Sequence, residues 1–473
     1  MEFWQSRIIQ TGLALVVLLI IGELARAAAA RFSGSSKAGI PASILAGAIG
    51  LLLGPEVIGL VDLDRQVLET VVYFGLGVVF IAVGLKEPAA GKAEARAGIK
   101  SFALGVPVMI SVQLGIGIAL VMALRTVGSD VHPGVGVMLP LGFEEGPGQA
   151  LALGSVWEDQ NGMAAGRQIG LIVAAVGFAW AVVIGVPMVI WGQRRGLLAK
   201  HAHEALEGQT SASAPDSMVT HEPTLAAGSL DILTRQVVAI GLCLLLTYFV
   251  CFGLSSALAS MPDIAAVIWG FHFIIGAIIA MMLRPLLKRL PQGTPLHDPT
   301  LTKLSGIGVD VMTCSAIAAI EIAVFRDHLL PIMLITTVGG IVTLLMCLWF
   351  SSRAFPDAPF EHAVVWFGTS TGTLPMGLAL LRIVDPHFKT TAPISAVLGS
   401  AASVPLGAIA LMVLVPASVS TFPEHYPGAG WLFALAAFAF AAVIVLAWAR
   451  FAGLKLTTAP MKLWYTPPSD SAD

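Results

Sequence analysis

The chain has 473 residues, of which 56% are hydrophobic and only 12% are charged, with a formal net charge of −3. Soluble domains carry about 25% charged residues, so this composition excludes a soluble protein and indicates an integral membrane protein. The four cysteines, Cys243, Cys251, Cys314 and Cys347, lie in apolar runs. That placement favours small buried side chains over a disulfide framework or a metal site.

Apolar runs follow one another along the chain, and about 20 helical residues suffice to cross the hydrocarbon core of a bilayer. The first run, residues 8–28, ends in ARAAAA. We expect a transmembrane helix there, with a signal peptide as the alternative. In all we expect eleven spans, at residues 8–28, 40–60, 67–85, 101–124, 168–191, 237–258, 264–286, 304–324, 329–350, 394–417 and 430–449.

Two further apolar segments are broken in the middle by glycine, proline and small polar residues. Residues 135–157 contain GFEEGPGQA, and residues 363–383 contain WFGTSTGTLPMGLALL. Backbone groups freed by such a break must be buried in protein or line a watery cavity, because lipid cannot satisfy them. We therefore expect two re-entrant hairpins, each entering and leaving the membrane on the same side.

Charge distribution sets the expected orientation. With the N-terminus outside and each hairpin returning to its starting side, the polar linker at 194–234 and the tail at 451–473 are cytoplasmic. Basic residues favour the cytoplasmic side of a membrane, and this arrangement places all but five of the 26 lysines and arginines there. The five expected outside are Arg7, Arg65, Arg125, Arg167 and Arg326.

The same topology predicts an all-α membrane protein with two inverted-topology repeats of five transmembrane helices. Each repeat has one re-entrant hairpin, and one extra C-terminal helix follows. Residues 142–146 (GFEEG) align with 368–372 (GTSTG), and paired broken segments in inverted repeats are typical of secondary transporters. The expected boundaries are repeat 1 at 1–193, linker at 194–234, repeat 2 at 235–418, additional helix at 429–450 and tail at 451–473.

The hairpin tips are the candidate binding region, because half-helix N-termini favour anionic groups and unwound carbonyls or hydroxyls favour Na⁺. The alternative is that the hydroxyls only satisfy broken backbone or permit close packing. The candidates in the first tip are Gly142, Glu144, Glu145, Gly146, Gly148 and Gln149; those in the second are Thr369, Ser370, Thr371, Gly372, Thr373 and Pro375.

Acidic residues within apolar segments are functional candidates by default. Three interpretations of Glu144 and Glu145 stay open: they bind a coupling cation, they form a wet entrance, or they are ordinary charges of a shallow loop. Asp310, followed by Thr313 and Ser315, is a candidate ion or substrate group, with an interfacial charge as its alternative.

At the hairpins the sequence resembles the bacterial glutamate:sodium symporter family. The first hairpin of that family has the form G-F-x-x-G-x-G-x-A, and GFEEGPGQA has every fixed position; GTSTGTLP fits the second form, G-x-x-x-G-x-x-P. The resemblance implies Na⁺-coupled uptake of an acidic amino acid by a homodimer, in which one domain moves against a fixed scaffold. The chain departs from that pattern at Glu144, Glu145, Pro147, Leu374 and Leu380.

We expect an ion-coupled carrier that imports a small anionic solute across a bacterial plasma membrane, with the sodium site unassigned. The sequence has no P-loop, HExxH or GxSxG motif in a fitting context, so we expect neither an enzyme nor a resident cofactor, and no nucleic-acid partner. The alternatives are a receptor with a transporter-like site, a proton-coupled carrier of another substrate, an intramembrane enzyme and a passive channel.

Overall fold

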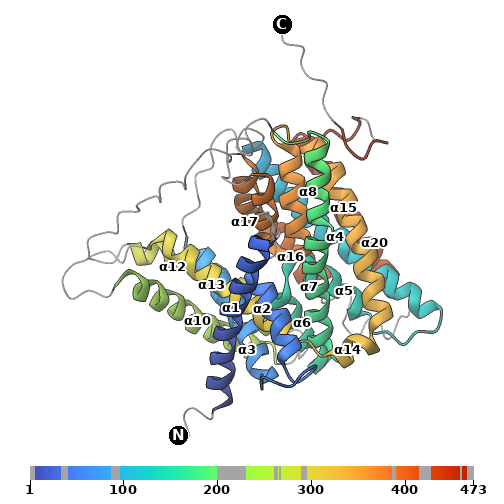
Figure 1. Ribbon diagram of the computed structural model, residues 1–473. Coiled ribbons are helices and arrows are strands. Elements are labelled where there is room, and N and C mark those ends of the chain that lie inside the picture. Colours follow the sequence, from blue (N-terminus) through green and yellow to red (C-terminus); the bar gives the residue numbers. More distant parts are fainter. Residues whose placement is uncertain are drawn as a thin grey trace.

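The computed structural model describes residues 6–32, 41–86, 96–199, 231–259, 265, 268–288, 296–385, 390–414, 428–458 and 461–465. Within these ranges the regular structure is helical, without strands (Figure 1). The helices are α1 (Arg7–Phe32), α2 (Ala42–Leu53), α3 (Arg65–Leu85), α4 (Arg96–Thr126), α5 (Gly134–Pro140), η3 (Leu141–Glu145), α6 (Pro147–Gln160), α7 (Gly166–Val183), α8 (Gly185–Arg194), α10 (Ile232–Ala257), α12 (His272–Lys288), α13 (Asp298–Ala318), α14 (Ile322–Asp327), α15 (Leu329–Ala354), α16 (Pro359–Val384), α17 (Ala392–Ile409), η5 (Ala410–Leu414) and α20 (Ala429–Phe451).

Ten of the described helices are long and apolar enough to cross a membrane, which makes the chain a multi-pass membrane protein. Nine of them correspond to expected spans, and the tenth is α16, which contains the second broken segment. One expected span is shorter than predicted, and another lies partly outside the described residues. The run at 40–60 forms only α2, because Gly54 and Pro55 end the helix. The run at 264–286 lies partly outside the described residues, and its apolar helix is described from His272.

Polar caps and close contacts explain where several helices begin and how they meet. Asp64 Oδ1 accepts a hydrogen bond of 3.1 Å from the Val67 amide at the start of α3. Such a cap satisfies one of the free N–H groups of a first turn. Asp231 caps α10 in the same way through the Thr234 amide, at 2.9 Å. The short helix α2 packs against both α1 and α13.

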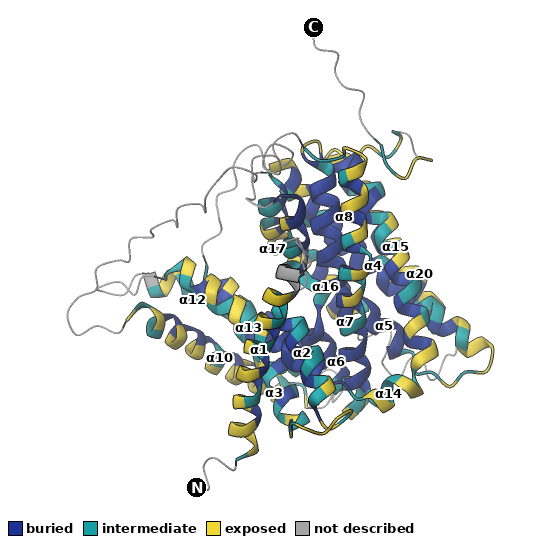
Figure 2. Cartoon of the chain, in the orientation of Figure 1, coloured by how far each residue is buried: buried dark blue, intermediate teal, exposed yellow. Residues whose placement is uncertain are grey.

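The interior of the described part of the chain contains three apolar clusters: a small one between α4 and α20 around Val108 and Ile444, and two more extensive ones. The smaller of these two joins α3, α10, α12 and α13 around Ile81 and Cys243. The larger includes α4 to α7 and α15 to α17 and contains the two broken segments. Helix α4 crosses this larger cluster and contacts α5, α15, α17 and α20. Figure 2 shows that the buried residues concentrate in this part of the molecule.

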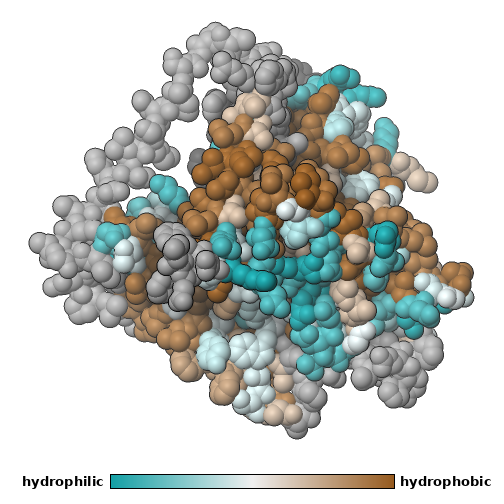
Figure 3. Space-filling model, turned by 60° about the horizontal axis from the view of Figure 1, so that its bottom comes forward, coloured by the Kyte–Doolittle hydropathy of each residue, from teal (hydrophilic) through white to brown (hydrophobic). Residues whose placement is uncertain are grey.

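The outward faces of several long helices are apolar, as lipid contact requires. On α10, Phe249 and Phe252 are more than half exposed, and on α20 Leu435 and Val443 are exposed to a similar extent. Figure 3 shows broad hydrophobic areas on the visible surface, next to a hydrophilic patch.

The C-terminal tail is fastened to the end of α15 by Arg353, whose side chain is almost completely buried. Its Nε donates to the carbonyl oxygen of Thr458 at 3.1 Å, and its Nη2 donates to that of Lys462 at 2.6 Å. The guanidinium also lies 4.2 Å from the Trp349 ring centroid, a favourable cation–π distance.

Replacement of Arg353 by alanine is expected to release the tail, because hydrogen bonds from a charged donor are lost together. Each is worth about 1.5–3 kcal/mol, so limited trypsin cleavage after Lys455 and Lys462 should accelerate at least about tenfold. Arg450→Ala, which removes an exposed arginine from the neighbouring helix, is the matched control. Equal cleavage rates in the wild type and Arg353→Ala would contradict this role.

Candidate functional site

The first broken segment consists of α5, η3 and α6, with Gly146 at the break. Gly146 has φ 89° and ψ −175°, a conformation that is essentially restricted to glycine. The two ends of the segment lie together, because His132 Nε2 is 3.0 Å from the carbonyl oxygen of Asn161. A Cβ atom on Gly134 would lie 2.8 Å from Met163 Sδ. The chain therefore runs out to Gly146 and returns beside itself.

The second broken segment lies within α16. Helical geometry fails at Gly372 (φ −159°, ψ 25°) and Thr373 (φ 71°, ψ 166°). A Cβ atom on Gly368 would lie 2.7 Å from Gly377 Cα, although nine residues of straight helix would separate them by about 13 Å. The two parts of α16 therefore lie against each other, and the glycines permit that approach.

The two breaks meet in space. A Cβ atom on Gly146 would collide with Thr373 Cγ2, so these two residues touch. Gly146 aligns with Gly372, the residue just before Thr373. Helix α7 supports both segments at one position, because a Cβ atom on Gly177 would collide with the Thr371 carbonyl and approach Phe143 Cδ1 to 2.9 Å. The sequence alignment of 142–146 with 368–372 thus corresponds to a physical junction.

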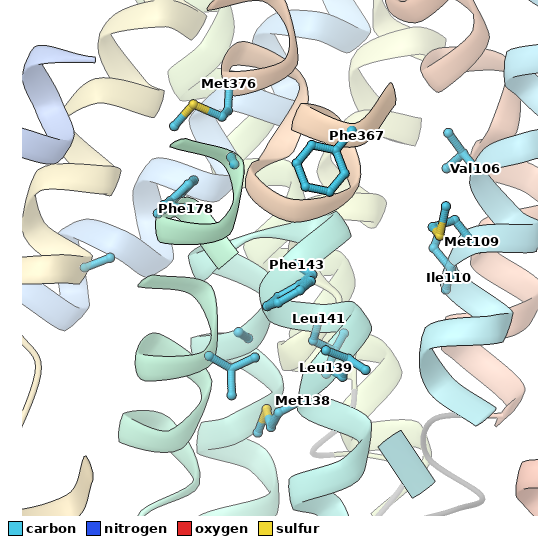
Figure 4. Packing of buried hydrophobic residues seen from close by; sticks show 14 of the residues in the cluster. Val106, Met109, Ile110, Met138, Leu139, Leu141, Phe143, Phe178, Phe367 and Met376 are labelled. Carbon is cyan, nitrogen blue, oxygen red and sulfur yellow. The ribbon is translucent and has the colours of Figure 1, made fainter. Parts of the chain in front are cut away.

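Apolar side chains surround this junction. Figure 4 shows Phe143 of the first segment below Phe367 of the second, with Phe178 of α7 and Met376 of the second segment to one side. All four side chains are buried. A Cβ atom on Gly372 would lie 2.9 Å from Phe178 Cδ1. The junction is therefore enclosed by hydrocarbon, and polar atoms left inside it are costly unless they find a partner.

Buried polar side chains gather at this junction, and some of their atoms have no hydrogen-bond partner among the described residues. Gln113 of α4 donates from Nε2 to Thr343 Oγ1 at 2.9 Å and to the Ser370 carbonyl at 3.0 Å. The Ser370 hydroxyl lies beside the Glu144 carboxyl, yet neither Ser370 Oγ nor Glu144 Oε2 has a well-formed hydrogen bond within the described residues. Cys347 of α15 is also close to Glu144. Four chain segments therefore contribute polar groups to one place.

The other residues of the first tip are arranged around Glu145. Glu145 Oε2 accepts a hydrogen bond of 2.8 Å from Gln149 Nε2, which leaves Gln149 Oε1 buried and without a partner in the described part of the chain. Gly148 packs against Leu76 of α3, since a Cβ atom there would lie 2.8 Å from Leu76 Cδ1. Glu144 is 7% exposed, so it is not an ordinary loop charge.

The hydroxyls of the second tip are not equivalent. Thr369 and Thr371 donate to the carbonyls of Val365 and Phe367, one turn earlier, at 2.8 Å. Such bonds use the hydroxyl protons, so these two oxygens can still accept a hydrogen bond or coordinate a cation but cannot donate to a ligand. Ser370 is the buried hydroxyl of this set that has no well-formed hydrogen bond and lies beside the Glu144 carboxyl.

Asp310, the third acidic candidate, lies on an exposed part of α13. Thr313 and Ser315 on the same helix are buried, and Ser315 Oγ has no partner among the described atoms. Helix α13 packs mainly on α3 and α2, with smaller contacts to α6 and α7. The described hydrogen bonds and ion pairs do not join Asp310 to either tip.

Sequence reasoning missed Gln113, Thr343 and Cys347, which come from α4 and α15 rather than from the broken segments. The available signal was Gln113 itself, a lone amide in the run VMISVQLGIGIAL. A polar side chain in the middle of an apolar span is expensive and marks a functional candidate. The spacing of Thr343 and Cys347 by four residues places them on one face of α15.

Comparisons with known proteins add no family assignment: neither a scan of family models nor a search of curated proteins finds a match for this chain. In the described part of the chain, no group of three or more His, Cys, Asp or Glu side chains could hold a metal ion. The fold therefore defines the class of the molecule, a multi-pass α-helical membrane protein, and its activity must be argued from the junction of the two broken segments.

Proposed function

We propose that the chain is an ion-coupled secondary transporter that carries a small organic solute at the junction of the two broken segments. One observation carries the proposal: Gly146 and Thr373 touch at breaks in two helical segments, beside the unpaired oxygens of Glu144 and Ser370. Discontinuous helices that meet around polar groups form the binding sites of many transporters. In this proposal the segments are re-entrant hairpins and the chain alternates access to the junction.

Helix packing supports an inverted repeat, because corresponding helices contact each other in corresponding ways. Helix α2 packs on α13 as α12 packs on α3, and α1 contacts α2 as α10 contacts α12. Helix α4 contacts the first broken segment as α15 contacts the second. We propose repeats at 1–193 and 235–418, an N-terminus outside a bacterial plasma membrane, and a homodimer related to glutamate:sodium symporters.

The proposed chemical class of the solute rests on the helix ends and the charged side chains at the junction. An anionic solute, such as an acidic amino acid, would have to use the N-terminal ends of α6 and of the second part of α16. Among the described residues, no lysine or arginine forms an ion pair with Glu144 or Glu145. A solute with an amino group as well as a carboxylate would use both the helix ends and the acidic side chains.

Uptake into proteoliposomes tests the proposal. We expect accumulation of at least one amino or organic acid from a panel when a Na⁺ or proton gradient is imposed. A receptor with a transporter-like site would instead show ligand-dependent thermal stabilisation without flux. Binding with no flux for any bound solute, under either gradient, would favour the receptor and contradict the transporter.

Gln113→Leu is expected to reduce uptake at least about tenfold, because the leucine can neither hold the Ser370 carbonyl nor offer its own oxygen to a ligand. The loss of its two hydrogen bonds also costs about 1–3 kcal/mol of stability, so uptake is normalised to folded protein by size-exclusion chromatography. Gln66→Leu on the exposed side of α3 is the matched control. Unchanged uptake in Gln113→Leu would remove this amide from the site.

A further inference from the structure

We propose that the free oxygens at the junction form a binding site for a monovalent cation, with Glu144 as its charged ligand and Gln113 and Ser370 as neutral ligands. The inference rests on the proposed function only in placing the site on the transport route. It names the chemistry that the site recognises.

Among the described residues, the unpaired buried side-chain atoms of Gln113 and of the two tips (142–149 and 369–375) are all oxygens. They are Gln113 Oε1, Glu144 Oε2, Gln149 Oε1 and Ser370 Oγ. An amide carbonyl and an ionised carboxylate can only accept hydrogen bonds, whereas a hydroxyl can also donate. A set of unpaired oxygens suits a cation or a donor-rich group rather than an anion.

The orientation of both amides follows from their partners. Gln113 Nε2 faces the Ser370 carbonyl, and Gln149 Nε2 faces the Glu145 carboxylate. These partners accept hydrogen bonds, so each amide must turn its nitrogen toward them and its oxygen away. Rotating either amide by 180° would place two acceptors together. The hydrogen bond of each amide nitrogen therefore fixes the direction of its unpaired carbonyl oxygen.

Glu144 forms no ion pair with a basic side chain of the described residues. Its side chain is 7% exposed, and the ion pairs of the described residues involve other carboxylates. An unpaired buried charge is strongly unfavourable, so a carboxylate in such a place either takes a proton or holds a cation. The neighbouring amide and hydroxyl oxygens supply the additional ligands that a bound cation needs, and protonation would leave them unused.

The charge count favours a monovalent ion. Glu145 is only partly buried and accepts a hydrogen bond from Gln149, so water can screen its charge, whereas Glu144 is the buried acid with an unpaired oxygen. One carboxylate with neutral oxygens balances a single positive charge. Two sources share this chemistry: an alkali ion from the medium, and the ammonium group of the solute, whose three N–H donors would meet three acceptors.

Thermal unfolding of the purified full-length protein separates these sources. The baseline is choline chloride, and the test solutions at equal ionic strength are NaCl, LiCl and methylammonium chloride. We expect the unfolding temperature to rise by roughly 5 °C at a hundredfold excess over Kd. A rise with Na⁺ or Li⁺ assigns the alkali ion, and a rise with methylammonium alone assigns an amine.

Glu144→Gln keeps the shape of the side chain and removes its charge. In choline this variant should unfold at the same temperature as the wild type or higher, because an uncompensated charge is gone. Its apparent affinity for the cation, measured from the dependence of the unfolding temperature on cation concentration, should be at least about tenfold weaker. Asp130→Asn, an exposed loop substitution, should keep the shift. No shift in the wild type, or an undiminished shift in Glu144→Gln, would overturn the proposal.

Two other outcomes have defined meanings. Stabilisation by acid alone, lost in Glu144→Gln, would identify a proton as the occupant and overturn the cation site. A cation-dependent shift that requires Glu144, without flux of any solute, would support the cation site and contradict the transporter. Flux that needs neither the cation nor Glu144 would support the transporter and contradict the cation site.

Discussion

Gly146→Ala is expected to lower solute uptake at least about tenfold, because it affects the junction in two ways. The backbone conformation of Gly146 (φ 89°, ψ −175°) costs an alanine about 1–3 kcal/mol. The added methyl group would also collide with Thr373 Cγ2. Uptake rates per folded protein in proteoliposomes measure the combined effect.

Two variants separate backbone strain from the collision. Gly128→Ala introduces alanine at a similar φ of 91°, but nothing lies within 4 Å of its Cβ position, so uptake should stay within about twofold of the wild type. Thr373→Ser removes Cγ2 and should partly restore uptake in the Gly146→Ala background. Equal uptake by Gly146→Ala and the wild type would show that the tips do not control transport.

Gly117→Ala is expected to produce the largest loss of stability. A Cβ atom on Gly117 would overlap the Gly136 carbonyl oxygen, and one on Gly136 would collide with the Gly117 carbonyl oxygen. Helices α4 and α5 therefore meet backbone to backbone, where no side chain can move aside. Overpacking costs typically 1–3 kcal/mol, so we expect about 3 kcal/mol and an unfolding temperature lower by several degrees.

Gly241→Ala is the matched control for this prediction. Gly241 lies in α10 with nothing within 4 Å of its Cβ position, and replacing an unhindered helical glycine by alanine gains roughly 0.5–1 kcal/mol. The two variants should thus shift the unfolding temperature in opposite directions. A fall of similar size in both would attribute the effect to a general intolerance of substitution and would contradict the close crossing.

The membrane class and most helices could be predicted from the sequence, because hydropathy records burial in lipid directly. The breaks at Gly146 and Gly372 were also predictable, since glycine and proline interrupt helices for local reasons. The shortness of α2 was missed even though Gly54 and Pro55 stand inside the expected span. Apolar composition outweighed those two residues in the prediction.

Fewer of the residues that meet at the junction could be predicted from the sequence. Glu144 and Ser370 were found because they lie beside the breaks, whereas Gln113 comes from α4, distant in sequence, and depends on which helices touch. Asp310, an acid within an apolar segment, stays an untested candidate: it lies on an exposed part of α13, and the sequence could not indicate which side of that helix is covered. Periodicity along one helix does not say which neighbour covers each face.

Counterflow is the measurement that tests the central claim most directly. Proteoliposomes are loaded with unlabelled solute and diluted into labelled solute, and the label inside is followed with time. A carrier that alternates the junction between the two sides predicts a transient overshoot above equilibrium, abolished in Gly146→Ala and retained in Gly128→Ala. Label that rises only to equilibrium, or does not enter at all for any solute that binds, would contradict it.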